Sequence, residues 1–148
     1  MSKTNNVSIQ YLDLFSGAGG FAKGLQDAGF HFEQHYFSEI DPYAIATYQY
    51  HFLKAQHLGD IKNIHEKSIH PDLISFGSPC QDISIAGKRA GLKGKRSGLF
   101  FEAIRLIKLY RPSVFIFENV KGLFSSNEGK DFEIVLQAFA DIGLYDCQ

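Results

Sequence analysis

A glycine-rich turn between an apolar strand and a helix constrains the fold of this chain more than any other stretch. Residues 7–14 (VSIQYLDL) predict a first strand, and residues 20–28 predict a helix that Gly29 ends. Between them, Gly17-x-Gly19-x-x-Ala22 has the form of the dinucleotide-binding fingerprint, in which glycines let the backbone approach a ligand. The same strand, turn and helix form the first unit of a doubly wound α/β fold.

The remainder of the chain alternates predicted strands and helices. Strands are expected at residues 30–38, 71–76 and 113–117 and from Leu144, and a short strand or a turn at residues 58–64. Helices are expected at residues 42–52 (capped by Asp41), 97–110 and 130–142. This alternation predicts an α/β fold with a doubly wound, mostly parallel, Rossmann-like sheet. In the usual order, strand 71–76 lies beside strand 7–14, and strand 113–117 lies beyond it.

Composition limits the classes of function. A net charge of −1 predicts no general affinity for nucleic acid, so any such contact is expected at a local patch. Two cysteines and no basic-then-apolar leader argue for a reducing intracellular compartment and against a disulfide framework. The scattered histidines predict no metal site, and no apolar run approaches the roughly 18 residues of a membrane span.

Glu39 is the predicted partner of the glycine-rich turn. It stands at the end of the second predicted strand, where an acidic side chain can hold ribose hydroxyls. The plainer interpretation is a tight turn with a solvated glutamate. The pattern by itself does not distinguish a nicotinamide dinucleotide from S-adenosylmethionine, since both ligands carry an adenosine.

Cys80 lies in a loop that follows the predicted strand at residues 71–76, and Pro79 restricts the backbone beside it. A single cysteine is ordinarily a small buried hydrophobe, but a thiolate near a helix N-terminus is a strong nucleophile. Glu118 and Asn119 follow strand 113–117, where Glu118 is expected to be partly buried and able to protonate a ring, unless both residues only cap the strand. The glycine-rich turn, Cys80 and Glu118 are therefore expected at one crevice.

A basic, glycine-rich loop follows Cys80. Its basic side chains are Lys88, Arg89, Lys93, Lys95 and Arg96. Such a charge run is usually a solvated face. Next to a nucleophile, however, it is expected to form a lid that meets phosphates and gives salt-dependent affinity for nucleic acid.

Three motifs in this order resemble those of DNA (cytosine-5) methyltransferases: residues 13–21 (DLFSGAGGF), residues 77–81 (GSPCQ) and residues 118–120 (ENV). The resemblance extends from Tyr11 to the last predicted helix and implies S-adenosylmethionine, not NAD, as the cofactor. It implies that Cys80 adds to C6 of a cytosine that has left the duplex, after which C5 takes the methyl group. Glu118 would hold N3 and the exocyclic amine, and Asn119 would position the catalytic loop.

The resemblance also implies a cofactor site and a DNA-contacting loop. Phe15, Gly17, Gly19 and Gly20 would line the cofactor, with Glu39 on the ribose. Ile40, Asp60 and Ile61 would flank the adenine, and Pro79 and Leu99 would close the pocket. The loop that closes over DNA would include Gln81, Ser84, Lys88, Arg89, Lys93, Lys95 and Arg96.

Members of that family continue into an arginine-containing motif, a target-recognition domain and a final helix, none of which is in this sequence. Residues 1–148 are therefore expected to be the N-terminal part of a catalytic domain, either as a fragment or as half of a split enzyme whose partner polypeptide supplies the rest. We expect little activity alone, exposed apolar sheet surface and self-association. The expected setting is a microbial cytoplasm and a restriction–modification system that acts on double-stranded DNA.

Two alternatives stay open. The tRNA cytosine-5 methyltransferases share the cofactor and the catalytic motifs, and a non-catalytic protein could use the same fold to bind cofactor or nucleic acid. An NAD-dependent dehydrogenase would explain neither Pro79-Cys80 nor Glu118-Asn119.

Overall fold

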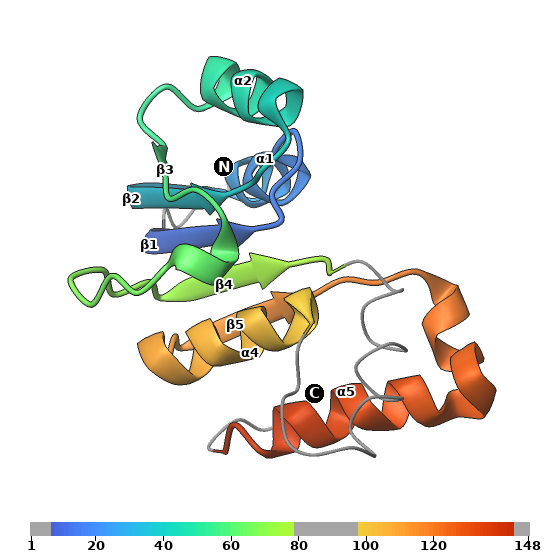
Figure 1. The fold of residues 1–148 in the computed structure, drawn as a ribbon. Helices are drawn as coiled ribbons and strands as arrows, with labels where there is room; N and C mark the ends of the chain where they lie inside the picture. Colours follow the sequence, from blue (N-terminus) through green and yellow to red (C-terminus); the bar gives the residue numbers. More distant parts are fainter. Residues whose placement is uncertain (1–6, 79–97, 144–148) are drawn as a thin grey trace, which may run out of the picture. The chain divides into compact units, whose positions relative to one another are not determined.

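The computed structural model describes residues 7–78 and 98–143, which belong to two compact units (Figure 1). The first unit is made of residues 1–77 and 110–117, and the second of residues 78–109 and 118–148. No helix among the described residues combines the length and the apolar character that crossing a bilayer requires.

The first unit is built on a five-stranded parallel sheet with the strand order β3-β2-β1-β4-β5. Its strands are β1 (Val7–Leu14), β2 (Phe30–Ser38), β3 (Gln56–His57), β4 (Leu73–Phe76) and β5 (Val114–Phe117). The order changes direction between β1 and β4, which is the point where doubly wound sheets bind their ligands. The predicted sheet and its neighbour relations are therefore confirmed.

Two helices, α1 (Gly20–Asp27) and α2 (Pro42–His51), pack on one face of this sheet. Ala22 of α1 and Tyr48 of α2 join Tyr11, Phe37 and Leu73 of the strands in one buried cluster. The predicted start of α2 is confirmed, because the carboxylate of the residue before it, Asp41, accepts a hydrogen bond from the Ala44 N–H at 2.8 Å.

Of the two possibilities predicted for residues 58–64, the short strand is wrong and the turn is confirmed. The strand β3 lies earlier in the sequence, and residues 61–63 form a short 3-10 helix, η1 (Ile61–Asn63). Gly59, with φ of +79°, leaves the extended conformation, and Asp60 caps η1 through the Lys62 N–H. The predicted strand at residues 113–117 is confirmed as β5, which lies at the edge of the described sheet, with Val114 half exposed. The strand predicted from Leu144 lies outside the described residues.

The second unit is helical in its described part. It contains α4 (Leu99–Tyr110), η2 (Lys121–Phe124), η3 (Ser126–Gly129) and α5 (Lys130–Ala140). The predicted helices at 97–110 and 130–142 are thus confirmed within a few residues at their ends. The buried carboxylate of Asp131 accepts hydrogen bonds from Ser126 and Asn127 and so holds the tight turn that precedes α5.

Gly19 is the position in the turn where a side chain would do most damage to this fold. Its φ is +97°, and a Cβ would overlap the Phe52 ring and approach the Tyr48 ring to 3.2 Å. We expect Gly19→Ala to lower the free energy of unfolding by about 2 kcal/mol or more, because backbone strain and overpacking add. The measurement is urea denaturation followed by circular dichroism.

Gly24→Ala is the matched control within α1. A Cβ there meets no atom within 4 Å. Alanine in a helix interior is better than glycine by about 0.5–1 kcal/mol, so this variant should be slightly more stable than the parent chain. Equal effects of the two substitutions would contradict the assigned packing of the turn.

Candidate functional site

The glycine turn, residues 15–20, leaves the carboxyl end of β1 in a strained conformation. Phe15, Gly17 and Gly19 have φ values of +53°, +52° and +97°. A positive φ is unusual for a bulky residue such as phenylalanine, and strain of this kind concentrates at ligand sites. The Ser16 N–H donates to the Ser38 carbonyl at 3.1 Å, so the turn is tied to the carboxyl end of β2.

Glu39 is held beside this turn by three backbone N–H groups. Its Oε2 accepts from the Gly17 N–H at 2.9 Å, and its Oε1 accepts from the Ile40 and Asp41 N–H groups at 2.8 and 3.0 Å. A carboxylate offers about four acceptor positions, so Oε2 keeps one for a further donor. The structure thus brings Gly17 and Glu39 together in an arrangement that suits a ligand hydroxyl.

The loop after β3 lies at the same end of the sheet. The Ser38 hydroxyl donates to the Gly59 carbonyl at 2.7 Å, which places Asp60 close to the end of β2. Ile40 is 70% exposed, whereas the Ile61 side chain is buried at 3% exposure. Ile40 and Asp60 can therefore present side chains to a ligand, while Ile61 can offer only its backbone.

A buried hydrogen-bonded network lies in the sheet directly before the turn. The carboxylate of Asp13 is fully buried and accepts from the Tyr48 hydroxyl through Oδ2 and from the Ser75 hydroxyl through Oδ1, both at 3.0 Å. Tyr48 is in turn 2.7 Å from Nε2 of His35, and Ser75 is 2.5 Å from the Tyr11 hydroxyl. These partners come from β1, β2, β4 and α2, so the network joins four elements.

Burial changes the protonation of this network. It raises the pKa of Asp13 to about 7, against hydrogen bonds from Tyr48 and Ser75 that favour the charged form. Burial also lowers the pKa of His35 to about 4 and raises the pKa of both tyrosines. Sequence reasoning missed the network, although a lone carboxylate at the buried end of an apolar strand was a visible signal.

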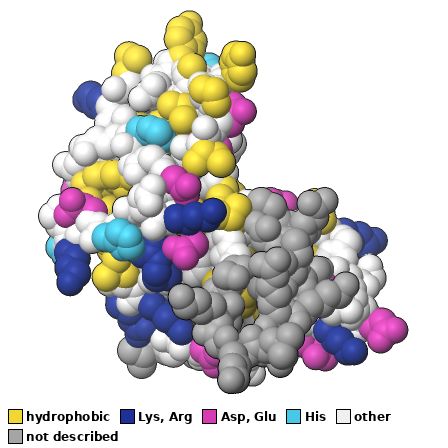
Figure 2. Space-filling view, viewed as in Figure 1, with side chains coloured by type: hydrophobic (Ala, Val, Ile, Leu, Met, Phe, Trp, Pro, Cys, Tyr) yellow, Lys and Arg dark blue, Asp and Glu magenta, His cyan; other side chains and the backbone are white. Residues whose placement is uncertain are grey.

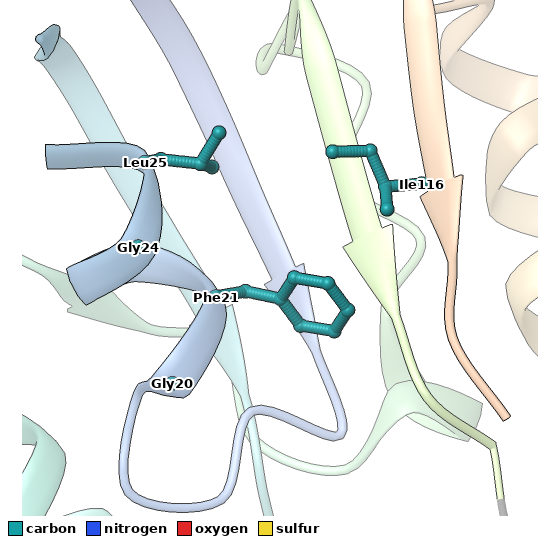
Figure 3. A pocket seen from close by; sticks show the side chains of 5 residues that line it. All are labelled: Gly20, Phe21, Gly24, Leu25 and Ile116. Atoms are coloured by element: carbon teal, nitrogen blue, oxygen red, sulfur yellow. The ribbon is translucent and has the colours of Figure 1, made fainter. Parts of the chain in front are cut away.

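An apolar pocket of about 430 Å³ opens between α1 and β5. In Figure 3, Phe21 and Leu25 of α1 and Ile116 of β5 face one another across it. Its lining is almost entirely apolar, so it does not suit a charged or hydroxylated ligand. Figure 2 shows hydrophobic side chains gathered on the face that it draws. Exposed apolar side chains on or beside α2 are Ile40, Tyr43, Tyr50 and Leu53. These side chains lie on or beside a helix, so the exposed sheet surface predicted for the chain stays a prediction.

Asn119 connects the loop after β5 to the segment that leads to Cys80. Its Nδ2 donates to the Ser78 carbonyl at 3.2 Å, while its Oδ1 accepts from the Val120 N–H at 2.8 Å. Glu118 is exposed, so the predicted partial burial of this side chain is wrong. The reason is that the chain leaves the sheet at Phe117, and Glu118 already belongs to the following loop.

Several predicted site residues cannot be placed. Those outside the described ranges are Pro79, Cys80, Gln81, Ser84, Lys88, Arg89, Lys93, Lys95 and Arg96. The predicted crevice at Cys80 also lies outside the described ranges.

Leu99 is the half-buried first residue of α4 in the second unit. Within residues 7–78 and 98–143, no three histidine, cysteine or acidic side chains are grouped so that they could hold a metal ion.

Known proteins resemble this chain over most of its length. An orphan methyltransferase of Bacillus phage SPR, M.SPRI, is 38% identical over 91% of this chain and 31% of its own length. The type II methyltransferase M.BsuFI of Bacillus subtilis is 34% identical over 96% of this chain and 36% of its own length. The chain therefore spans about a third of the length of these curated relatives.

A solved structure gives the same picture of the fold. The crystal structure of an E. coli prophage-encoded protein, described as a DNA modification methyltransferase, is 28% identical and superposes with a TM-score of 0.62. The match covers 89% of this chain and 38% of the other. The model of the C-5 cytosine-specific DNA methylase family matches residues 9–148. This chain, with its parallel sheet and its glycine turn bonded to Glu39, belongs to that family of DNA methylases.

Proposed function

We propose that this chain is the N-terminal part of the catalytic domain of a DNA cytosine-5 methyltransferase and binds S-adenosylmethionine at the glycine turn. The observation that carries the proposal is the hydrogen bond between the Gly17 N–H and Glu39 at the carboxyl ends of β1 and β2, in a chain of the C-5 cytosine-specific DNA methylase family. The proposed setting is restriction–modification of double-stranded DNA in a microbial cytoplasm, as the names of type II relatives suggest.

The groups around the turn fit an adenosine. The free acceptor position on Oε2 of Glu39 suits a ribose hydroxyl, and the exposed Ile40 offers an apolar surface to the adenine ring. Asp60 can accept from the exocyclic amine, and the glycine backbone at positions 17, 19 and 20 leaves room for the rest of the ligand. When bound, S-adenosylmethionine supplies an electrophilic methyl group.

At the base, we assign the chemistry to the loops after β4 and β5. The Cys80 thiolate forms a bond to C6 of an extruded cytosine, which makes C5 nucleophilic toward the methyl group. Glu118 holds N3 and the exocyclic amine. C5 would then take the methyl group as the bond between that methyl and the cofactor's sulfur breaks. Loss of the C5 proton to solvent and elimination would release Cys80. The Asn119–Ser78 hydrogen bond supports a positioning role for Asn119, because Ser78 is two residues from Cys80.

The base-reading function is assigned to a region that this chain does not span. We propose that a separate C-terminal polypeptide, or a continuation of the chain, carries the target-recognition domain. The basic residues between Lys88 and Arg96 would then contribute phosphate contacts that carry no sequence information.

Glu39→Gln tests the cofactor site. Glutamine has one acceptor oxygen in place of two and presents N–H groups where Glu39 now accepts. We expect S-adenosylmethionine affinity to fall roughly 10- to 100-fold, as for a lost hydrogen bond to a charged group. Isothermal titration calorimetry measures the affinity of each protein for S-adenosylmethionine. Glu33→Gln, an exposed position on β2, is the control and should bind as the parent chain does. Equal affinity of all three proteins would contradict the site.

Methyl transfer tests the reaction. Labelled methyl incorporation into duplex DNA should be close to background for residues 1–148 alone. It should appear when the C-terminal part of a relative such as M.BsuFI is fused to the chain. Cys80→Ala should abolish this transfer and Cys147→Ala should not, because only Cys80 lies in the predicted catalytic motif.

Three outcomes of that assay would change the proposal. Transfer that survives Cys80→Ala would remove the covalent mechanism. Transfer to tRNA but not to duplex DNA, measured in parallel, would move the chain to the tRNA branch. Transfer by residues 1–148 alone at a defined DNA site would show that no further polypeptide is needed.

A further inference from the structure

We propose that Tyr48 is a positioning residue for the cofactor turn. It acts through the buried chain His35–Tyr48–Asp13, whose direction of hydrogen-bond donation reverses when Asp13 takes up a proton. The inference rests on the proposed cofactor site, which the glycine turn forms. None of these three side chains is assigned a part in methyl transfer itself.

Counting the available hydrogens determines which groups donate and which accept along the hydrogen bonds from His35 to Asp13. Charged Asp13 can only accept, so the single hydroxyl hydrogen of Tyr48 must point to Oδ2. His35 must then donate from Nε2 to the Tyr48 oxygen, which requires the Nε2–H tautomer. On the other side, Ser75 donates to Oδ1 and therefore accepts from Tyr11.

Protonation of Asp13 on Oδ2 reverses the Tyr48 branch. The new carboxyl O–H donates to Tyr48, whose own hydrogen must then point to Nε2 of His35. His35 accepts only if its proton has moved to Nδ1, so the net change is uptake of one proton by the network. The reversal is possible on the His35 side of the network because an imidazole can carry its proton on either of two nitrogens.

Tyr48 is also the direct packing support of the turn. The closest atoms of its ring would lie 3.2 Å from a Cβ at Gly19, and its ring stacks on Phe37 with centroids 4.1 Å apart. Its helix, α2, follows Glu39, whose carboxylate holds the Gly17 N–H. A change at the Tyr48 hydroxyl therefore reaches both the glycines and the ribose-binding carboxylate.

Among the described residues, the groups that face Asp13 come from four elements. β1 contributes Tyr11, β2 contributes His35, and α2 contributes Tyr48, while β4 contributes the non-titrating Ser75. Glu39 adds a like charge from the end of β2. With His35 neutral near pH 7 and both tyrosines protonated, Asp13 is the group in the network that titrates near neutrality.

The imidazole nitrogen shifts of His35, measured by ¹⁵N NMR on the unliganded chain, test the reversal. We expect the Nε2–H tautomer above and the Nδ1–H tautomer below a midpoint of about pH 7. Tyr48→Phe should abolish the change, and Tyr50→Phe, an exposed tyrosine on the same helix, should leave it intact. Asp13→Asn does not titrate and can donate through its amide, so His35 should keep the Nδ1–H tautomer on both sides of that midpoint.

A tautomer that is constant across the range in the parent chain would overturn the relay. So would a tautomer change that persists in Tyr48→Phe or in Asp13→Asn. Tyr48→Phe removes the bridging hydroxyl, and Asp13→Asn removes the titrating carboxyl group. If one variant does not fold, the other still tests the relay. Circular dichroism melts of each variant establish that it is folded.

S-adenosylmethionine affinity tests the positioning role. We expect the affinity of the parent chain to change several-fold across the Asp13 midpoint. In Tyr48→Phe this pH dependence should be lost and affinity lowered about 3- to 10-fold. A purely structural tyrosine would lower stability without altering the pH profile. An affinity and profile in Tyr48→Phe equal to those of Tyr50→Phe would overturn the role.

The two proposals fail in different ways. If the parent chain binds no S-adenosylmethionine, the proposed cofactor site is wrong and the positioning role falls with it. The relay is then judged on the His35 tautomer alone, which needs no ligand. If the parent chain binds but the tautomer does not move, only the relay is wrong.

Discussion

The buried carboxylate of Asp13 is the constraint on which the first unit depends. A carboxyl group without access to water is costly unless hydrogen bonds replace its hydration. The donors that do so, Tyr48 and Ser75, come from α2 and β4, and their own partners come from β2 and β1. Satisfying one group thus sets the relative positions of four elements at the point where β1 ends.

The glycine turn starts two residues after Asp13, so the place of Asp13 in the sheet also determines where the turn begins. The Gly17 N–H of this turn donates to the carboxylate of Glu39 across the carboxyl ends of β1 and β2. The ring of Phe52 fills the space in which a side chain at Gly19 would stand, and the ring of Tyr48 packs beside it. A rigid, pre-shaped turn is useful for ligand binding because less conformational freedom is lost when the ligand arrives.

Local sequence patterns predicted much of this architecture. The bounds of β1 and β2, the Asp41 cap and the β1–β4 neighbourhood follow from apolar runs, cap chemistry and topology rules. At residues 58–64 the patterns left a short strand and a turn open, and Gly59 and the Asp60 cap decide for the turn. The prediction failed at Glu118, whose exposure depends on where the chain leaves the sheet. Neither outcome is encoded in periodicity.

The sequence by itself determined the family motifs, the alternation of strands and helices, and the pairing of a glycine turn with an acidic residue. These are local features, set by residue type and spacing along the chain. Only the tertiary structure decided that Asp13, His35, Tyr48 and Ser75 form one network. The physical reason is that residues 62 positions apart, such as Asp13 and Ser75, meet only when parallel strands pair in register. Burial then determines their protonation, which no sequence pattern records.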